Sequence, residues 1–261
     1  MEVLIRPTAA DAVRLAARMI AETVRSKPAC NLGLATGGTM EAVYADLVEM
    51  NRRGEVDFSQ VTSFNLDEYV GLGPDHPNSY RHYMDFHLFD RVNIDKRRTH
   101  LPDGLAKDEA AETAAYEEAI RAAGGIDLQL LGIGCDGHIA FNEPGCSLAG
   151  RTHVQLLTPA TYEQNSGYFN PPESMPMRAF TMGVGTIMEA RRTVLLITGK
   201  RKAEIAVRAI EGPVTAMVTA SALQFHPDAV AILDEEAAAL LGQKEYYRGV
   251  FEKDPRWALY R

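Results

Sequence analysis

Residues 128–144 read LQLLGIGCDGHIAFNEP, an apolar run that ends in glycines and ionisable side chains. The apolar part, Leu128 to Ile133, has the length and composition of a buried strand. Three glycines in the next few positions let the backbone turn sharply and approach a ligand closely. Pro144 then prevents a long regular helix. The ionisable residues of this loop are Asp136, His138 and Glu143. This order predicts an active-site loop at the carboxyl edge of an α/β sheet.

Two other interpretations of this loop deserve comparison. Residues 132–137 match the glycine spacing of a dinucleotide-binding turn, but that motif also needs a following helix and an acid about 20 residues later. Pro144 interrupts the helix, and residues 156–158 contain no acid. Asp136, His138 and Glu143 are also metal-ligand types, but short Asp-x-His pairs are common without a metal. We therefore favour proton transfer by these side chains over nucleotide binding or metal binding.

The composition describes an ordinary globular chain. Its 261 residues are 46% hydrophobic and 24% charged, with a formal net charge of −8. That charge argues against a nucleic-acid surface but permits a locally positive pocket for an anionic small molecule. The sequence contains neither a signal-peptide pattern nor an apolar run of membrane-spanning length. The three cysteines, Cys30, Cys135 and Cys146, fit reduced thiols, so a cytoplasmic protein without a membrane partner is expected.

Strand and helix patterns alternate along the chain. Strands are expected at 3–5, 30–35, 61–65, 128–133, 180–184, 194–198 and 229–233, and helices at about 8–27, 40–50, 78–89, 109–123 and 202–210. This alternation predicts a single α/β domain over residues 1–261, with one doubly wound, mostly parallel sheet flanked by helices, as in Rossmann-like folds. Residues 152–177 are polar, rich in proline and weakly periodic, which suggests a mobile lid over the active site.

Two turns are candidate anion sites. Thr36, Gly37, Gly38 and Thr39 lie between an expected strand and an expected helix, an arrangement that directs free backbone N–H groups at an anion. The alternative is a tight turn that binds nothing. Gly199 and the basic residues Lys200, Arg201 and Lys202 make a second such turn possible, and positive charge before a helix is unfavourable for the helix dipole, which mildly favours a functional role. The alternative there is a solvated basic helix start.

Asp67 and Glu68 follow the strand expected at 61–65. Neighbouring residues on a strand point to opposite faces, so the two acids are not expected to share one role. An acid at the carboxyl end of a strand is well placed for chemistry. By itself, however, the pattern favours an acid that caps the next segment.

Four motifs together carry a resemblance to a known family. They are LGLATGGT at 32–39, NLDEYVG at 65–71, GIGCDGHIAFNEP at 132–144 and GVGT at 183–186. The chain resembles the glucosamine/galactosamine-6-phosphate isomerase family over nearly its whole length. The resemblance implies an enzyme of amino-sugar catabolism that converts glucosamine 6-phosphate and water into fructose 6-phosphate and ammonia, without a metal or organic cofactor.

The resemblance also implies roles for individual residues. His138 would assist opening of the pyranose ring, and Asp136 and Glu143 would orient and tune it. Asp67 would remove the proton from C2 and return a proton at C1. The substrate phosphate would bind to the turn at 36–39 and to Lys202. The family includes monomers and hexamers, so both a monomer and a homo-oligomer are compatible with the sequence.

The chain departs from the family pattern in two places. Family members usually carry a phosphate-binding arginine in the lid, where this chain has Gly167. Either phosphate binding is weaker, or another cation such as Arg151 or Arg178 replaces it. Relatives that are activated by N-acetylglucosamine 6-phosphate use a serine, an arginine and a lysine where this chain has Cys146, His153 and Gln155. Little or no activation by that sugar is therefore expected.

Three alternatives stay open from the sequence. A 6-phosphogluconolactonase shares the general fold but would not need Asp67 as a carbon base. A sugar-phosphate sensor would carry a DNA-binding helix-turn-helix, for which the strand expected at Val3 leaves no room. Galactosamine 6-phosphate is a close rival as substrate because it differs only in the configuration of one hydroxyl group.

Overall fold

The computed structural model describes residues 1–169 and 174–261. Its main feature is a seven-stranded sheet in which all described pairs of neighbours run parallel. In spatial order the strands are β1 (Glu2–Arg6), β10 (Ala229–Asp234), β9 (Arg192–Ile197), β6 (Leu128–Leu131), β2 (Asn31–Leu34), β3 (Thr62–Asn65) and β5 (Thr99–His100). The predicted doubly wound α/β sheet is confirmed.

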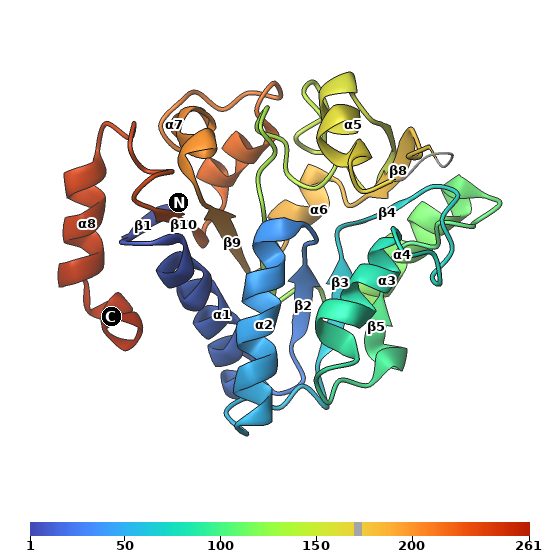
Figure 1. The fold of residues 1–261 in the computed structure, drawn as a ribbon, viewed down its shortest axis with the longest axis horizontal. Helices are drawn as coiled ribbons and strands as arrows, with labels where there is room; N and C mark the ends of the chain where they lie inside the picture. The colour runs from blue at the N-terminus through green and yellow to red at the C-terminus, as the bar shows by residue number, and fades with distance from the viewer. Residues whose placement is uncertain (170–173) are drawn as a thin grey trace.

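Helices cover the sheet and bury its apolar strands, as parallel sheets require. The α-helices are α1 (Ala9–Ser26), α2 (Gly38–Arg52), α3 (Tyr80–Met84), α4 (Glu109–Ala122), α5 (Pro159–Ser166), α6 (Val184–Met188), α7 (Ala203–Ile210) and α8 (Lys244–Lys253). Shorter turns are the π-helical η1 (Asp85–Phe89) and the 3-10 turns η2 (Lys96–Arg98), η3 (Lys200–Lys202), η4 (Thr219–Phe225) and η5 (Pro255–Tyr260). Figure 1 shows α1 and α2 side by side on one face, with α8 at the edge near β1.

The direction of chain progression reverses between β2 and β6. From β2 the chain continues to β3 on one side, whereas from β6 it continues to β9 on the other. The loops that leave these two neighbouring strands therefore diverge, and a crevice forms at their carboxyl ends, where ligands bind in open α/β sheets. These loops are the turn at 36–39 and the loop at 132–144, so the topology brings the two candidate motifs together.

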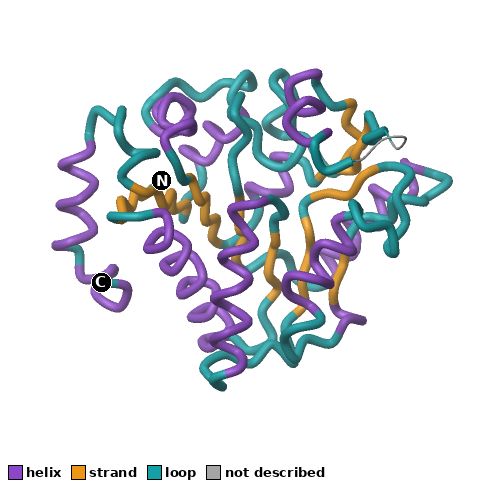
Figure 2. The backbone as a smooth tube through the Cα atoms, in the orientation of Figure 1, coloured by secondary structure: helices purple, strands orange, loops and turns teal. Residues whose placement is uncertain are grey.

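A second, smaller sheet adds to the predicted architecture. It contains β4 (Asp67–Tyr69), β8 (Arg178–Thr181) and β7 (His153–Leu156), paired antiparallel. Leu66 joins β3 to β4, so the chain passes from one sheet to the other directly before Asp67. Figure 2 shows this small sheet beside the upper end of the central strands. The expectation of one sheet thus holds for the core but not for the segment that carries Asp67.

Some predicted elements differ in detail. The strand expected at 180–184 ends at Thr181, because Val184 already begins α6. The single helix expected at 78–89 is divided between α3 and the π-helical turn η1. The segment expected as an irregular lid contains β7 and α5, while its residues 170–173 lie outside the described part of the chain. None of the helices described is both long enough and apolar enough to span a bilayer.

Candidate active site

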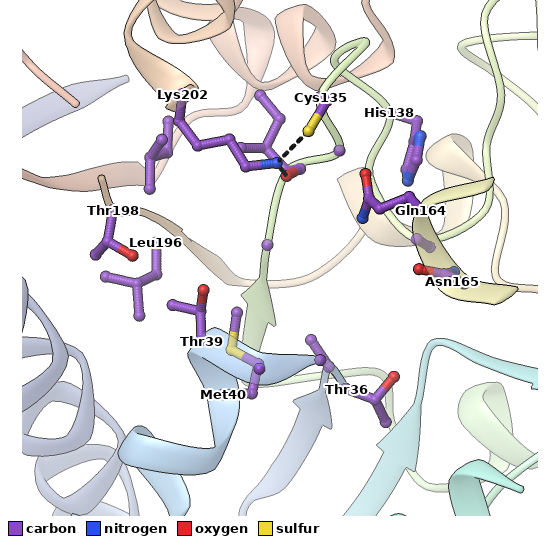
Figure 3. Close-up of a pocket in the computed structure, with 18 of the residues that line it drawn as sticks. Thr36, Thr39, Met40, Cys135, His138, Gln164, Asn165, Leu196, Thr198 and Lys202 are labelled. Carbon is purple, nitrogen blue, oxygen red and sulfur yellow. Dashed lines mark hydrogen bonds between the residues drawn. The ribbon is translucent and has the colours of Figure 1, made fainter. Parts of the chain in front are cut away.

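A cavity of about 790 Å³ lies at the carboxyl ends of the central strands. It brings together most of the predicted site: the turn at 36–39, Asp67, His138 and Lys202 all line it. Figure 3 shows His138 on one side of this cavity with Gln164 and Asn165, and Lys202 on the other side with Thr198 and Thr39. After the roles that the resemblance implies, we call Asp67, Asp136, His138 and Glu143 the reaction end, and the turns at 36–39 and 199–202 the phosphate end.

Asp67 is the most desolvated acid in the cavity wall. Its side chain is buried, with 6% of the residue exposed, and no described residue donates a hydrogen bond to its carboxyl group. Burial, followed by the negative charge of neighbouring Glu68, raises the pKa of Asp67 to about 8. A carboxylate with a pKa near neutrality is a much stronger base than an ordinary aspartate. The site therefore contains a buried carboxyl group whose conjugate base is stronger than that of an exposed aspartate.

Glu68 has a different task, as the alternation along a strand predicted. Its carboxylate accepts the backbone N–H groups of Tyr69 (2.8 Å), Tyr80 (3.0 Å) and Arg81 (2.9 Å). Two of these groups belong to the first turn of α3. Burial raises the pKa of Glu68 to about 7, although the three hydrogen bonds oppose this. Glu68 thus fixes α3 against β4, while Asp67 faces the cavity.

His138 lies between two carboxylates. Its Nδ1 is 2.7 Å from Oδ1 of Asp136 and 3.7 Å from Oε2 of Glu143. Asp136 also accepts the backbone N–H of His138 at 3.1 Å. Burial would raise the pKa of Asp136, but its contacts with His138 outweigh burial and lower that pKa below its usual value. Asp136 therefore stays ionised, and its negative charge lies beside the Nδ1 edge of the imidazole.

Gly134 provides the floor on which the imidazole lies. A Cβ atom at this position would be 2.5 Å from Nδ1 of His138, far inside van der Waals contact. The φ angle of Gly134 is not positive, so the need for glycine is steric and not conformational. The absence of a side chain at Gly134 therefore leaves the space in which the imidazole of His138 lies, and the carboxylates of Asp136 and Glu143 lie beside the ring.

Glu143 is held by the start of the segment that was expected to be a lid. The residue is buried, and its two oxygens accept the backbone N–H (3.1 Å) and the hydroxyl (3.2 Å) of Thr158. Thr158 is the N-cap of α5. Because α5 also contributes Gln164 and Asn165 to the cavity, this contact connects the orientation of His138 to the position of α5.

The three residues around His138 also satisfy the minimum geometry for a metal site. One ligand atom from each of Asp136, His138 and Glu143 lies within 4.8 Å of the others. The convergence that the sequence could not establish is therefore present. However, the oxygens of Glu143 are already occupied by Thr158, and both carboxylates face the same ring nitrogen. This arrangement suits the orientation of an imidazole better than the coordination of an ion.

The phosphate end is more exposed. Gly37 is the N-cap of α2, with a φ of 114°, and no side chain caps the helix. The first N–H groups of α2 are thus available to an anion, as predicted for the turn at 36–39. From the other side, Nζ of Lys202 reaches the cavity, donating to the carbonyl of Ile133 at 2.7 Å and lying 3.4 Å from Sγ of Cys135 (Figure 3).

The two arginines considered as replacements for a lid arginine are engaged elsewhere. Arg151 forms ion pairs with Glu117 and Glu189, and Arg178 pairs with Glu109. Neither of them lines the cavity, so neither is placed to bind a phosphate there. Gly167 is the C-cap of α5, and a Cβ at this position would meet no other atom within 4 Å.

Sequence reasoning missed several residues that line the cavity. They are Tyr80, Phe141, Gln164, Asn165, Tyr168 and Glu236. The amides and Tyr168 belong to the polar segment at 152–177, where hydrophobic periodicity is too weak to indicate direction. Lys200 and Arg201, which belong to the second candidate anion turn, also line the cavity.

Cys146, His153 and Gln155, which stand where activated relatives are expected to bind N-acetylglucosamine 6-phosphate, contact one another in this structure. The thiol of Cys146 donates to Oε1 of Gln155 (3.1 Å), and Nε2 of His153 lies 3.2 Å from the same oxygen. Nδ1 of His153 lies 2.9 Å from the carbonyl of Arg151. None of the three side chains has the permanent positive charge of an arginine or lysine, and their polar atoms already contact one another.

Comparisons with known proteins agree with this geometry. Residues 6–231 match the family described as glucosamine-6-phosphate isomerases/6-phosphogluconolactonase. The chain belongs to this family. A relative named glucosamine-6-phosphate deaminase from Rhodopirellula baltica is 51% identical over 94% of this chain and 97% of its own length. One from Shewanella loihica is 49% identical over 96% and 93%.

The solved structures that resemble this chain include a deaminase and lactonases. A monomeric glucosamine-6-phosphate deaminase superposes with a TM-score of 0.89 and 43% identity, covering 92% of this chain and all of that chain. The 6-phosphogluconolactonase from Trypanosoma cruzi superposes with a TM-score of 0.72 over 92% of this chain and 97% of its own, but with 21% identity. The second likeness shows the shared fold alone.

Proposed function

We propose that this protein converts glucosamine 6-phosphate and water into fructose 6-phosphate and ammonia. The observation that carries the proposal is that one cavity holds both Asp67, a desolvated carboxylate, and His138, an imidazole flanked by two carboxylates. An amino-sugar phosphate needs both groups, one for ring opening and one for proton transfer between carbons. Relatives with this name share 46–51% of the sequence.

Ring opening is the task we assign to His138. The bond between C1 and the ring oxygen breaks as the C1 hydroxyl loses its proton and the ring oxygen gains one, with the imidazole relaying the proton. A neutral imidazole has one ring nitrogen that accepts a proton and one that donates a proton, so it can relay a proton between two oxygens. Asp136 and Glu143 keep the ring in one orientation during this exchange. The products of this step are a C1 aldehyde and a free C5 hydroxyl.

Asp67 then moves a proton between adjacent carbons. Its carboxylate removes the proton from C2, the electron pair forms the C1–C2 double bond of an enolamine, and the C1 carbonyl oxygen takes a proton from solvent to become a hydroxyl group. Asp67 returns a proton to C1, which leaves an imine at C2. Water adds to this imine, and ammonia leaves to give the ketone. A fixed general base of this kind is worth about 10²–10⁴-fold in rate.

The experiment is ammonia release by the purified protein from glucosamine 6-phosphate and, separately, galactosamine 6-phosphate in deuterium oxide. Release from the first sugar with deuterium at C1 of the product is expected. Release mainly from the second keeps the mechanism and changes the substrate. Hydrolysis of 6-phosphogluconolactone without ammonia release from either sugar would favour the lactonase reaction instead. Dialysis against EDTA is expected to leave ammonia release unchanged.

We further propose that residues 1–261 act as one domain in which residues 152–177 close over the bound sugar. The support is that α5 contributes Gln164 and Asn165 to the cavity wall and holds Glu143 through Thr158. Hydrogen exchange of the α5 amides should slow when glucosamine 6-phosphate is added. Unchanged exchange at saturating substrate would remove the support for a lid. A cytoplasmic location stays a prediction from the sequence.

A further inference from the structure

The turn that carries Lys202 contains three successive cations. Lys200, Arg201 and Lys202 form the 3-10 turn η3 between β9 and α7, and all three line the same cavity as the turn at 36–39. Three positive charges directly before the first residue of α7 oppose its helix dipole. These three charges therefore do not stabilise α7, and their position before this helix needs another explanation.

Lys200 and Arg201 lack a protein partner for their charge. Neither takes part in an ion pair with any residue of ranges 1–169 and 174–261, and both are exposed. Glu236 lies in the same cavity wall but accepts the backbone N–H of Lys200 at 3.3 Å instead of pairing with its ammonium group. By contrast, Arg151 and Arg178 are held by carboxylates outside the cavity.

Lys202 alone is a poor match for a phosphate dianion. A phosphate monoester carries a charge of about −1.5 to −2 at pH 7, whereas Lys202 supplies one positive charge. One of its three N–H donors is already directed at the carbonyl of Ile133. The turn at 36–39 adds backbone N–H groups but no side-chain cation. The charge balance of the phosphate end is incomplete unless a further cation contributes.

We propose that Arg201 and Lys200 bind the phosphate of the substrate together with Lys202. This inference rests on the proposed function, since it assigns the phosphate contacts of the same site. It also gives a reason why this chain can have Gly167 at the C-cap of α5: the cation is supplied from the η3 turn, on the opposite side of the cavity. The proposed residues recognise the dianion and not the sugar, so they should favour phosphorylated over unphosphorylated amino sugars.

The test uses the full chain with Arg201→Gln, Lys200→Gln and the double substitution. Arg52→Gln is the matched control, because it removes the same charge from an exposed position at the end of α2, away from the cavity. For the double variant we expect KM for glucosamine 6-phosphate to rise roughly tenfold, with a smaller change in kcat, because charged hydrogen bonds are lost. The inhibition constant of inorganic phosphate should rise in parallel.

A second measurement separates this inference from the proposed function. Inorganic phosphate should raise the melting temperature of the wild type and of Arg52→Gln, and this rise should shrink in the double variant. An active wild type with unchanged KM and unchanged phosphate inhibition in the double variant would overturn the inference alone. If no ammonia is released by the wild type, the proposed function fails, and the thermal response to phosphate still decides whether η3 binds the anion.

Discussion

The two ends of the cavity are built in opposite ways. The reaction end is shielded from solvent: Asp67 and Glu143 are buried, and the carboxylates of Asp136 and Glu143 lie beside the imidazole of His138. The phosphate end is open to solvent: Gly37, Gly38, Thr39, Lys200 and Arg201 are exposed. The difference fits the chemistry, because a carboxylate becomes a stronger base when it is desolvated, whereas a dianion binds to charged groups and N–H donors that it can reach from solvent. Substitutions at the two ends should therefore change different kinetic parameters.

The largest expected effect is on turnover at the reaction end. Asp67→Asn should lower kcat about 10²–10⁴-fold, because an amide cannot accept the C2 proton. Lys202→Gln should instead act mainly on KM, because the phosphate is bound in both the ground state and the transition state. Steady-state ammonia release gives both parameters. Equal losses of kcat in the two variants would break the distinction between the ends.

A steric change beneath His138 should have the next largest effect. Gly134→Ala places a methyl group where the imidazole now lies, so the ring must move, and a displacement of about 1 Å can cost roughly 10²-fold in kcat. Gly249→Ala in α8 is the control, since its Cβ would meet no atom within 4 Å. A Gly134→Ala enzyme that keeps wild-type kcat would show that the position of the ring is not set by this contact.

The raised pKa of Asp67 predicts the pH dependence of the reaction end. The base must be ionised, so kcat/KM should fall about tenfold per unit as the pH drops below the pKa of Asp67, which is about 8. Comparing pH 7 with pH 9 keeps the phosphate a dianion throughout, since its second pKa is about 6. A flat profile over this range would place the pKa of Asp67 lower than its burial implies.

The stability of the protein offers an independent measure of the same pKa. The folded pKa of Asp67 is raised, so the folded state retains a proton that the unfolded state loses between pH 3.8 and about 8. This contribution to stability is full below pH 3.8 and is lost as the pH rises to about 8. The melting temperature of Asp67→Asn should therefore exceed that of the wild type by a margin that grows between pH 5 and pH 9.

The smallest expected effect is that of N-acetylglucosamine 6-phosphate. The cluster of Cys146, His153 and Gln155 is satisfied internally and offers no fixed positive charge to a second phosphate. Adding this sugar at subsaturating substrate should leave the rate unchanged. A several-fold activation would show that an anion site exists outside both ends of the cavity.

The position of several candidate site residues at one edge of the sheet was predictable because they follow strands. Asp136, His138 and the turn at 36–39 come directly after apolar runs, and parallel strands bring their carboxyl ends to one edge. Lys200 and Arg201 were visible beside Lys202 but carried no pattern that distinguished a ligand site from a solvated turn. Gln164 and Asn165 were not predictable, since their segment has almost no hydrophobic periodicity to orient it.

The sequence by itself determined the alternation of strands and helices, the loops that bear polar residues and the family, because these depend on local pattern and motif. Only the tertiary structure decided what surrounds each polar group. It placed Asp67 on a second sheet and buried it, turned Glu68 towards α3, set His138 on Gly134 and engaged Arg151 and Arg178 away from the cavity. The physical reason is that desolvation and charge pairing arise between segments distant in sequence, and no local pattern records them.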